Sequence, residues 1–392
     1  MRNLLLACFL VIGAAQGAED CKSGAKQEHA SWPAFGMVDS HVYDKYAFLH
    51  FSKEPPTTLE WKLVWVWSMP GGTPAQINDT VAKAKALGFN AVAWQVSPEP
   101  ERWKAFIHAC RKHGLESYAP ISVANEEAIS YKQELLPGEE NLPSGPKYDP
   151  AHQQGGEPLG GVAGKEIMTA TLPDFRHPFV AEKFREKIRT AINQGHTGIA
   201  LDYIGFRNYH ACACALCKRL LERSAPPGMS QQQAADRFHE ETLVKFYEEL
   251  CGYARAYAAS LSRKVKITCH VYPVFLPNVL YGNRLPVDYC GQTVSWFFHP
   301  HWNFEKIERY ARFVVDYEAQ HYETSVGAPF IGFYGKDIEA VHVKSAERVR
   351  KEIQTVKACG ARVVQFAELG NLLAVPAVAK VVAEEPRGTP EP

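Results

Sequence analysis

From residue 61 onward, short apolar runs alternate with helix-like segments along the chain. Such alternation is typical of repeated βα units around a parallel sheet. We count eight runs, the number that closes a barrel, so the predicted fold class is α/β, a (β/α)8 TIM barrel with a long insertion after strand 3. The predicted strands are LVWVWS (63–68), AVAWQV (91–96), SYAPISV (117–123), GIALDY (198–203), KITCHVY (266–272), QTVSWFF (292–298), PFIGFY (329–334) and VVQFAEL (363–369).

The segments between the runs have the signals of helices. Three of them stop at Gly88, Gly114 and Gly360, and glycine is a frequent helix-stop residue. In the longest segment, apolar residues recur at three- and four-residue steps or their sums, which predicts a stripe that packs on the sheet. The stripe consists of Phe238, Phe246, Leu250, Tyr253, Tyr257 and Leu261.

Four further segments complete the predicted organisation. Residues 1–18 combine Arg2, an apolar run and small residues, which predicts a secretory signal peptide and an exported protein, secreted or periplasmic. Residues 19–60 are expected to pack on the barrel, which spans 61–384. The Gly/Pro-rich insertion 124–175 is too long for an ordinary connection and is expected to form a lid or a wall of the site. The polar, proline-rich tail 385–392 is expected to be disordered.

Charge narrows the range of partners. The chain has 43 basic and 43 acidic residues, so its formal net charge is zero. This balance gives no electrostatic reason to expect nucleic acid or an anionic membrane as a partner. After removal of the signal peptide, no stretch is long and apolar enough to span a bilayer.

Asp202 is the first candidate for a catalytic residue. In TIM barrels the active site lies where the strands end and the βα loops begin. Side chains alternate along a strand, so Ile199, Leu201 and Tyr203 point one way and Ala200 and Asp202 the other. Large apolar residues suit the helix layer, and we therefore expect Asp202 to point into the barrel mouth.

Other strand ends also carry polar and aromatic residues. Aromatic rings stack on the apolar faces of sugar rings, although core packing is an equally good interpretation of each tryptophan. The histidines are candidate proton donors or hydrogen-bond partners of sugar hydroxyls. The expected substrate-binding residues are Trp67, Trp94, His270, Tyr272, Trp296, His299 and Tyr334.

The run from DFRHPFVAEKFREKIRTAINQGHTGIALDYIGF into CACALC resembles the fourth-strand region of a large group of bacterial glycoside hydrolase-like TIM barrels. The resemblance implies a carbohydrate-active barrel with Asp202 in its site. Gly205 departs from the pattern, because the group usually has arginine there, and Arg207 is the candidate to replace that substrate contact. The matching positions are Pro178, Gly195, Gly198, Asp202, Tyr203, Ile204, Phe206, Cys212, Cys214 and Cys217.

Glycoside cleavage usually needs a second carboxyl group. Glu368 is the first choice, Asp337 the second and Glu126 the third. Strands four and eight face each other across a barrel roughly 15 Å wide, which leaves roughly 8 or 9 Å between inward carboxyl groups and favours inversion. Glu368 and Gln365 have opposite strand parity, so Glu368 either lies past the regular strand or forms a structural ion pair.

The cysteines of the Cys-x-Cys-x-x-Cys cluster, Cys212, Cys214 and Cys217, have two interpretations. With His210 or Cys251 as a fourth ligand they could hold a structural zinc ion. In an oxidising compartment they could instead form disulfides. In both cases the cluster fixes the loop after Asp202, and no cofactor is required for catalysis.

The predicted function is an exported glycoside hydrolase that cleaves glycosidic bonds in a polysaccharide or oligosaccharide by carboxylate acid/base catalysis. The alternative is a TIM barrel that binds glycans without cleaving them. A third option is a metal-dependent hydrolase, because VDSHVYD (38–44) resembles an Asp-x-His-x-His motif, although Tyr43 occupies the place of the second histidine.

Overall fold

The described part of the molecule contains the barrel. The computed structural model describes residues 58–69, 71–95, 98–123, 131–132, 134, 172–205, 212, 214–224, 227–228, 231–271, 285–297, 301–315, 325–338 and 341–385. The predicted signal peptide, nearly all of segment 19–60, most of the insertion 124–175, the 38–44 motif and residues 386–392 lie outside the described residues.

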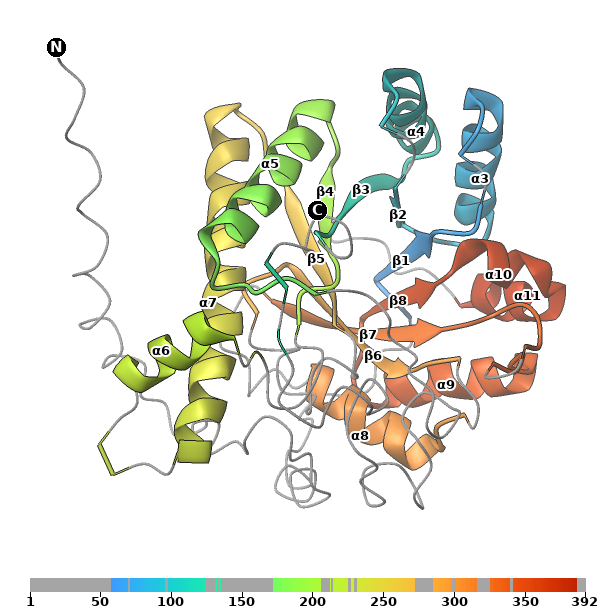
Figure 1. Ribbon diagram of the computed structural model, residues 1–392. Coiled ribbons are helices and arrows are strands. Elements are labelled where there is room, and N and C mark those ends of the chain that lie inside the picture. The colour runs from blue at the N-terminus through green and yellow to red at the C-terminus, as the bar shows by residue number, and fades with distance from the viewer. Residues whose placement is uncertain are drawn as a thin grey trace, which may run out of the picture. The chain divides into compact units, whose positions relative to one another are not determined.

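Eight parallel strands close into a barrel in chain order, with β8 next to β1. Figure 1 shows the strands in the centre with helices around them. The predicted (β/α)8 fold is therefore confirmed. The strands are β1 (Trp61–Val66), β2 (Ala91–Trp94), β3 (Glu116–Ile121), β4 (Gly198–Leu201), β5 (Lys266–Val271), β6 (Tyr289–Ser295), β7 (Val326–Gly332) and β8 (Val363–Ala367).

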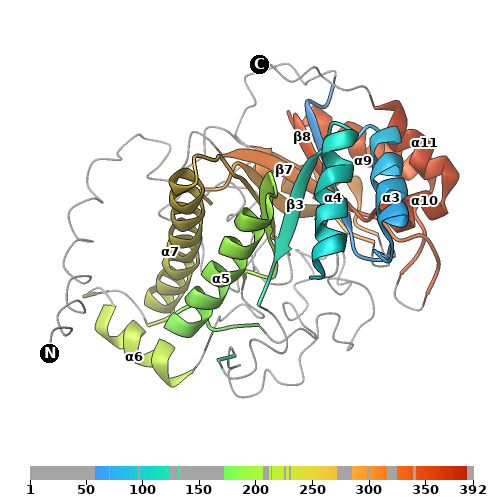
Figure 2. The same cartoon turned by 90° about the horizontal axis from the view of Figure 1, so that it is seen from above.

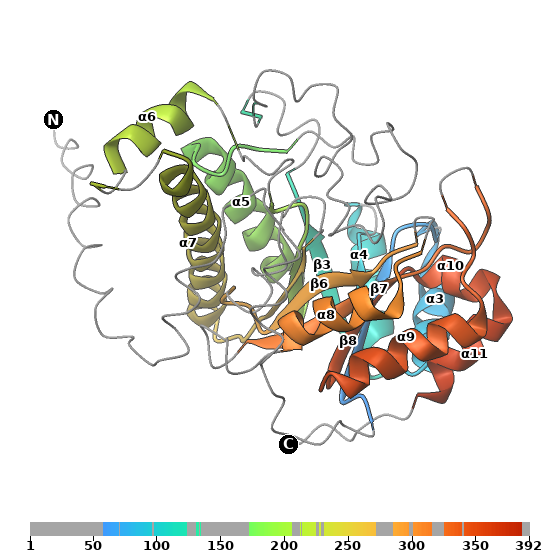
Figure 3. The same ribbon diagram turned by 90° about the horizontal axis from the view of Figure 1, so that it is seen from below.

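Helices cover the outside of the barrel, and in the described ranges at least one helix follows each strand except β5. Figure 2 shows α5 beside α7 and α3 beside α4, and Figure 3 shows α8 beside α9. None of the helices in the described ranges is long and apolar enough to cross a membrane. The helices are α3 (Pro74–Ala86), α4 (Pro100–Lys112), α5 (Pro178–Gln194), α6 (Ala215–Ser224), α7 (Gln231–Ser260), α8 (Phe304–Val315), α9 (Ala346–Ala358), α10 (Leu369–Ala374) and α11 (Pro376–Glu384).

Local sequence signals explain where several helices begin and end. Thr73 and Gln76 form a capping box at the start of α3, each side chain accepting a hydrogen bond from the backbone N–H of the other residue. The predicted stops at Gly88, Gly114 and Gly360 are confirmed, because these residues adopt positive φ angles of 83°, 63° and 93° just after α3, α4 and α9.

The central part of the predicted stripe on α7 is buried. Phe246 and Leu250 are buried, and the Phe246 ring lies 5.1 Å from that of Phe175 and 5.5 Å from that of Phe184 on α5. These contacts direct this part of the stripe toward α5 and the segment before it, whereas the sequence predicts packing on the sheet. Leu261 lies one residue beyond the helix and is exposed.

The barrel interior is a packed core at its amino end. The rings of Trp61 and Tyr289 stack with centroids 4.0 Å apart, and Lys266 pairs with Glu116 at 2.6 Å. The interior cluster consists of Trp61, Leu63, Trp65, Ala91, Ala93, Tyr118, Ala200, Trp296, Ala328, Phe330, Val363 and Ala367. The described part of the barrel interior is thus a packed core and not an open pore.

Candidate active site

Asp202 comes directly after β4, at the carboxyl end of the barrel. Its backbone N–H donates to the carbonyl oxygen of Ile121 at the end of β3, at 3.0 Å. Ala200, two residues earlier, belongs to the interior cluster, so Asp202 has the inward parity that the sequence predicts. The side chain of Asp202 is 16% exposed, which leaves the carboxylate within reach of solvent.

Two N–H groups converge on the carboxylate of Asp202. The backbone N–H of Tyr203 donates to Oδ1 at 3.0 Å, and Tyr203 adopts a left-handed φ of 57° that turns the chain at this point. Nδ1 of His270, on the neighbouring strand β5, lies 3.4 Å from the same oxygen. Both contacts fix the orientation of the carboxyl group.

His270 is a buried, neutral imidazole. Burial lowers the pKa of His270, and the hydrogen bond to Asp202 opposes that shift only in part. Its Nε2 lies 3.0 Å from Oγ1 of Thr293 on β6. From this network we assign the tautomer in which Nδ1–H donates to Asp202 and Nε2 accepts from the Thr293 hydroxyl.

Aromatic rings hold His270 in place. Its ring stacks on Phe330 of β7 with centroids 3.8 Å apart, and the rings of Trp296 and Trp65 lie at 5.6 and 5.9 Å. Nε1 of Trp65 in turn donates to Oε1 of Gln365 at 2.9 Å. The imidazole therefore has little freedom to rotate, and neither has the carboxylate that it contacts.

Glu368 follows β8 and is fully buried. It is the N-cap of α10, where its two oxygens accept from the backbone N–H groups of Gly370 and Asn371 at 3.1 and 2.8 Å. Oε2 also accepts from the backbone N–H groups of Trp67 and Ser68 at 3.5 and 3.4 Å, and the Ser68 hydroxyl donates to Oε1. Glu368 thus lies past the regular strand, one of the two arrangements that its parity predicts.

The other predicted acids are placed differently. Asp337 is exposed in the loop after β7, and its Oδ1 accepts from the backbone N–H of Val343 at 2.7 Å. Glu126 lies outside the described residues. Of the three predicted carboxylates within the described residues, Asp202 is the one that lies beside a buried histidine.

The predicted tryptophans lie in three different environments. Trp67, just beyond β1, is 46% exposed. Trp296 is buried among the residues of the barrel interior. Trp94 is buried with its ring edge-on to Phe106 of α4, a contact that places it between barrel and helices.

Tyr334 is half-buried, and its ring centroid lies 5.5 Å from that of Phe297. Arg207, Tyr272, His299 and His210 lie outside the described residues.

The three cysteines of the Cys-x-Cys-x-x-Cys cluster meet a residue that the sequence interpretation missed. Cys212, Cys214 and Cys217 group with Asp174, with all four ligand atoms within 4.8 Å of one another. Asp174 lies just before α5, 40 residues from Cys214 along the chain, and no spacing rule connects the two. The sequence interpretation also missed Thr293, although this residue lies within the predicted strand 292–298.

Comparisons with known proteins match the chain by fold. No protein-family model matches, and no curated protein is similar in sequence. A beta-galactosidase from the Antarctic haloarchaeon Halorubrum lacusprofundi matches with a TM-score of 0.50 and 10% identity, over 79% of this chain and 52% of that one. The chain thus spans about half the length of that enzyme.

Two further solved structures have lower TM-scores. The glycoside hydrolase domain of PgaB (BpsB) from Bordetella bronchiseptica matches with a TM-score of 0.49 and 12% identity, over 84% of this chain and 99% of that one. A family GH18 chitinase from Cycas revoluta matches with 0.45 and 11%, over 83% and 99%. At these identities the likeness concerns the fold alone.

Proposed function

We propose that this chain is an exported glycoside hydrolase in which Asp202 is the central carboxylate. The carboxyl group of Asp202 is partly exposed at the carboxyl end of the barrel and lies against the buried, neutral His270, and this arrangement supports the proposal. Catalytic residues of TIM-barrel enzymes come from this end of the strands. The beta-galactosidase that shares the fold is compatible with such chemistry.

The contacts of Asp202 favour one of the two carboxylate roles in glycoside cleavage. Tyr203 and His270 both present N–H donors to Oδ1, and donors suit a carboxylate that accepts. We assign Asp202 the role of general base or nucleophile, opposite a separate proton donor. No cofactor takes part in this mechanism.

The mechanism also needs a proton donor. Glu368 and Asp337 are the predicted partners, and a separation of roughly 8 or 9 Å between Asp202 and Glu368 stays a prediction that favours inversion. The contacts of Glu368 also support a positioning role, because both of its oxygens accept from backbone N–H groups. Among them is the N–H of Trp67, so Glu368 fixes the segment that carries this exposed ring.

The substrate class follows from the side chains at the carboxyl end. Trp67 presents an exposed indole, on which the apolar face of a sugar ring can stack. Tyr334 lies half-buried after β7 and adds a hydroxyl group. We therefore propose a polysaccharide or oligosaccharide substrate that contacts several loops at once.

The test is a comparison of the mature wild type with Asp202→Ala on a panel of polysaccharides and oligosaccharides. Release of new reducing ends by the wild type, lost in the variant while glycan binding remains, is the expected result. A wild type that binds a glycan of the panel and releases no reducing ends would contradict the proposal and favour the glycan-binding barrel. Unchanged hydrolysis by the variant would remove Asp202 from the chemistry.

A further inference from the structure

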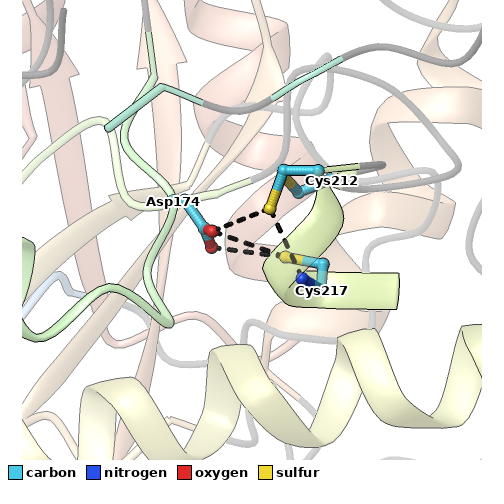
Figure 4. A group of neighbouring side chains, drawn as sticks. Asp174, Cys212 and Cys217 are labelled. Carbon is cyan, nitrogen blue, oxygen red and sulfur yellow. Dashed lines mark hydrogen bonds between the residues drawn. The ribbon is translucent and has the colours of Figure 1, made fainter. Parts of the chain in front are cut away.

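Asp174, Cys212, Cys214 and Cys217 form a buried cluster beside the barrel mouth, hereafter the Cys3Asp cluster. All four residues are buried. One carboxylate oxygen of Asp174 lies 3.2 Å from Sγ of Cys214 and 3.4 Å from Sγ of Cys217. Figure 4 shows the carboxylate of Asp174 and the sulfur atoms of Cys212 and Cys217 directed toward one another.

The spacing of these atoms matches a tetrahedral ion. Zinc–sulfur and zinc–oxygen bonds of about 2.3 and 2.0 Å place neighbouring sulfur and oxygen ligands about 3.5 Å apart and two sulfurs about 3.8 Å apart. The sulfur–oxygen distances from Asp174 to Cys214 and Cys217 are 3.2 to 3.5 Å. Four ligand atoms within 4.8 Å of one another can therefore surround one ion with little movement.

The surroundings of the cluster supply hydrogen-bond donors to the sulfur atoms. The guanidinium of Arg176 donates to Sγ of Cys217 at 3.2 Å. The backbone N–H of Glu134 donates to Sγ of Cys212, and that of Cys217 donates to Sγ of Cys214, both at 3.4 Å. Donors of this kind orient metal-bound thiolates and offset their negative charge.

The charge of Asp174 favours a metal ion over a disulfide. A disulfide uses two of the three cysteines and leaves the carboxylate of Asp174, 6% exposed, beside a buried thiol. Buried charges in proteins are paired or coordinate metals. Arg176 lies 4.0 Å from Asp174 and supplies one positive charge. Once a metal ion had displaced the thiol protons, three thiolates and the carboxylate would carry four negative charges. A divalent cation would balance two of the three negative charges that remain.

We propose that the Cys3Asp cluster is a structural zinc site, with Asp174 in the place for which His210 or Cys251 was considered. Three thiolates favour zinc over magnesium or calcium, which prefer oxygen ligands. Four protein ligands close the coordination sphere, so the ion has a structural role and stands apart from the hydrolysis chemistry.

The position of the site indicates that the ion would connect two segments of the chain. Asp174 precedes α5, Cys212 and Cys214 precede α6, and Cys217 lies in the first turn of α6. The backbone N–H of Asp174 donates to the carbonyl of Tyr131, and Lys132 pairs with Pro173. One ion would thus tie the base of the insertion after β3 to the far end of the loop that begins at Asp202.

Metal content of the purified full chain tests the site, independently of any hydrolysis. We expect about one zinc ion per chain by mass spectrometry, and a sulfur-to-cobalt charge-transfer absorption after cobalt exchange. Asp174→Ala should lose most of the zinc, and Asp174→Cys, which restores a fourth ligand, should retain it. Cys110→Ser is the matched control, because Cys110 is a buried cysteine of α4 and does not belong to the Cys3Asp cluster. This variant should retain full zinc.

Two results would overturn the proposal. One is a wild type that carries no zinc as purified and takes up neither zinc nor cobalt on addition. The other is a disulfide between two of Cys212, Cys214 and Cys217, found by peptide mapping of the native chain. If a variant fails to fold, the wild type still decides, because a chelator should lower its melting temperature and added zinc should restore it.

Discussion

Nδ1 of His270, on β5, lies 3.4 Å from Oδ1 of Asp202, which directly follows the neighbouring strand β4. The imidazole is fully buried and is hydrogen-bonded on its far side by Thr293. A partly exposed carboxylate is thus oriented by a residue that the barrel core holds still. Such support fixes a reactive group in one direction without placing another charge beside it.

His270 should therefore affect turnover through the position of Asp202. We expect His270→Phe to lower kcat about 100-fold, because a misplaced reacting group is costly even when it stays in the site. His270→Asn keeps an N–H donor near the position of Nδ1 and should lose less. Steady-state kinetics at one pH, with melting temperatures for both variants, checks this. Equal kcat for His270→Phe and the wild type would contradict it.

The variant Glu368→Gln can distinguish between a positioning role and a catalytic role of Glu368. If it positions Trp67, Glu368→Gln should lower the free energy of unfolding by about 1–3 kcal/mol and raise KM, since an amide replaces an acceptor of several N–H groups. If it is the catalytic partner, kcat should fall as far as in Asp202→Asn with little change in stability. Trp67→Ala, which should raise KM alone, is the control.

Stability should fall in mild acid because of buried histidines. Burial lowers the pKa of His196 from 6.5 to about 4, so between these values the unfolded chain binds more protons than the folded one. The free energy of unfolding therefore decreases as the pH falls below 6.5, by about 2 kcal/mol between pH 7 and pH 5 from His196. His270 acts in the same direction.

Urea unfolding at pH 7 and pH 5 measures this effect. In His196→Gln the difference between the two pH values should shrink by about 2 kcal/mol, because the glutamine does not titrate in this range. An undiminished difference in this variant would assign the acid sensitivity to other groups.

Gly198 is required by close packing at the start of β4. A Cβ atom at this position would lie 2.2 Å from the ring of Tyr118. Gly198→Ala should therefore lower the free energy of unfolding by about 1–3 kcal/mol, as overpacked cores do. Gly252→Ala, on an exposed face of α7 with nothing within 4 Å of its Cβ, should instead stabilise the chain by about 0.5–1 kcal/mol. Denaturant midpoints of both variants check the contrast.

The sequence predicted the barrel because each strand run is apolar and each helix carries its own stop signal. β6 and β7 begin three residues earlier than the sequence predicts, since Gly291 and Gly327 interrupt the β-rich pattern there. The inward parity of Asp202 followed from alternation along four residues. The local sequence pattern was sufficient to predict those features that depend on residues within one strand or helix.

The rest of the site depends on contacts between distant segments. Asp174 joins the cysteines from 40 residues away, and Glu368 reaches Ser68 from 300 residues away. Neither pairing leaves a spacing signal in one sequence. The hydrogen bond between His270 and Thr293 needs the register of β5 against β6, which a strand count does not supply.

The ratio of kcat between the wild type and Asp202→Asn, measured on the first glycan that the wild type cleaves, tests whether Asp202 takes part in hydrolysis. Asp79→Asn is the matched control, because Asp79 is an exposed acid paired with Lys83 on the outer helix α3. We predict a loss of at least about 100-fold for Asp202→Asn with unchanged melting temperature, and no loss for Asp79→Asn. A kcat for Asp202→Asn equal to that of Asp79→Asn would contradict the assignment.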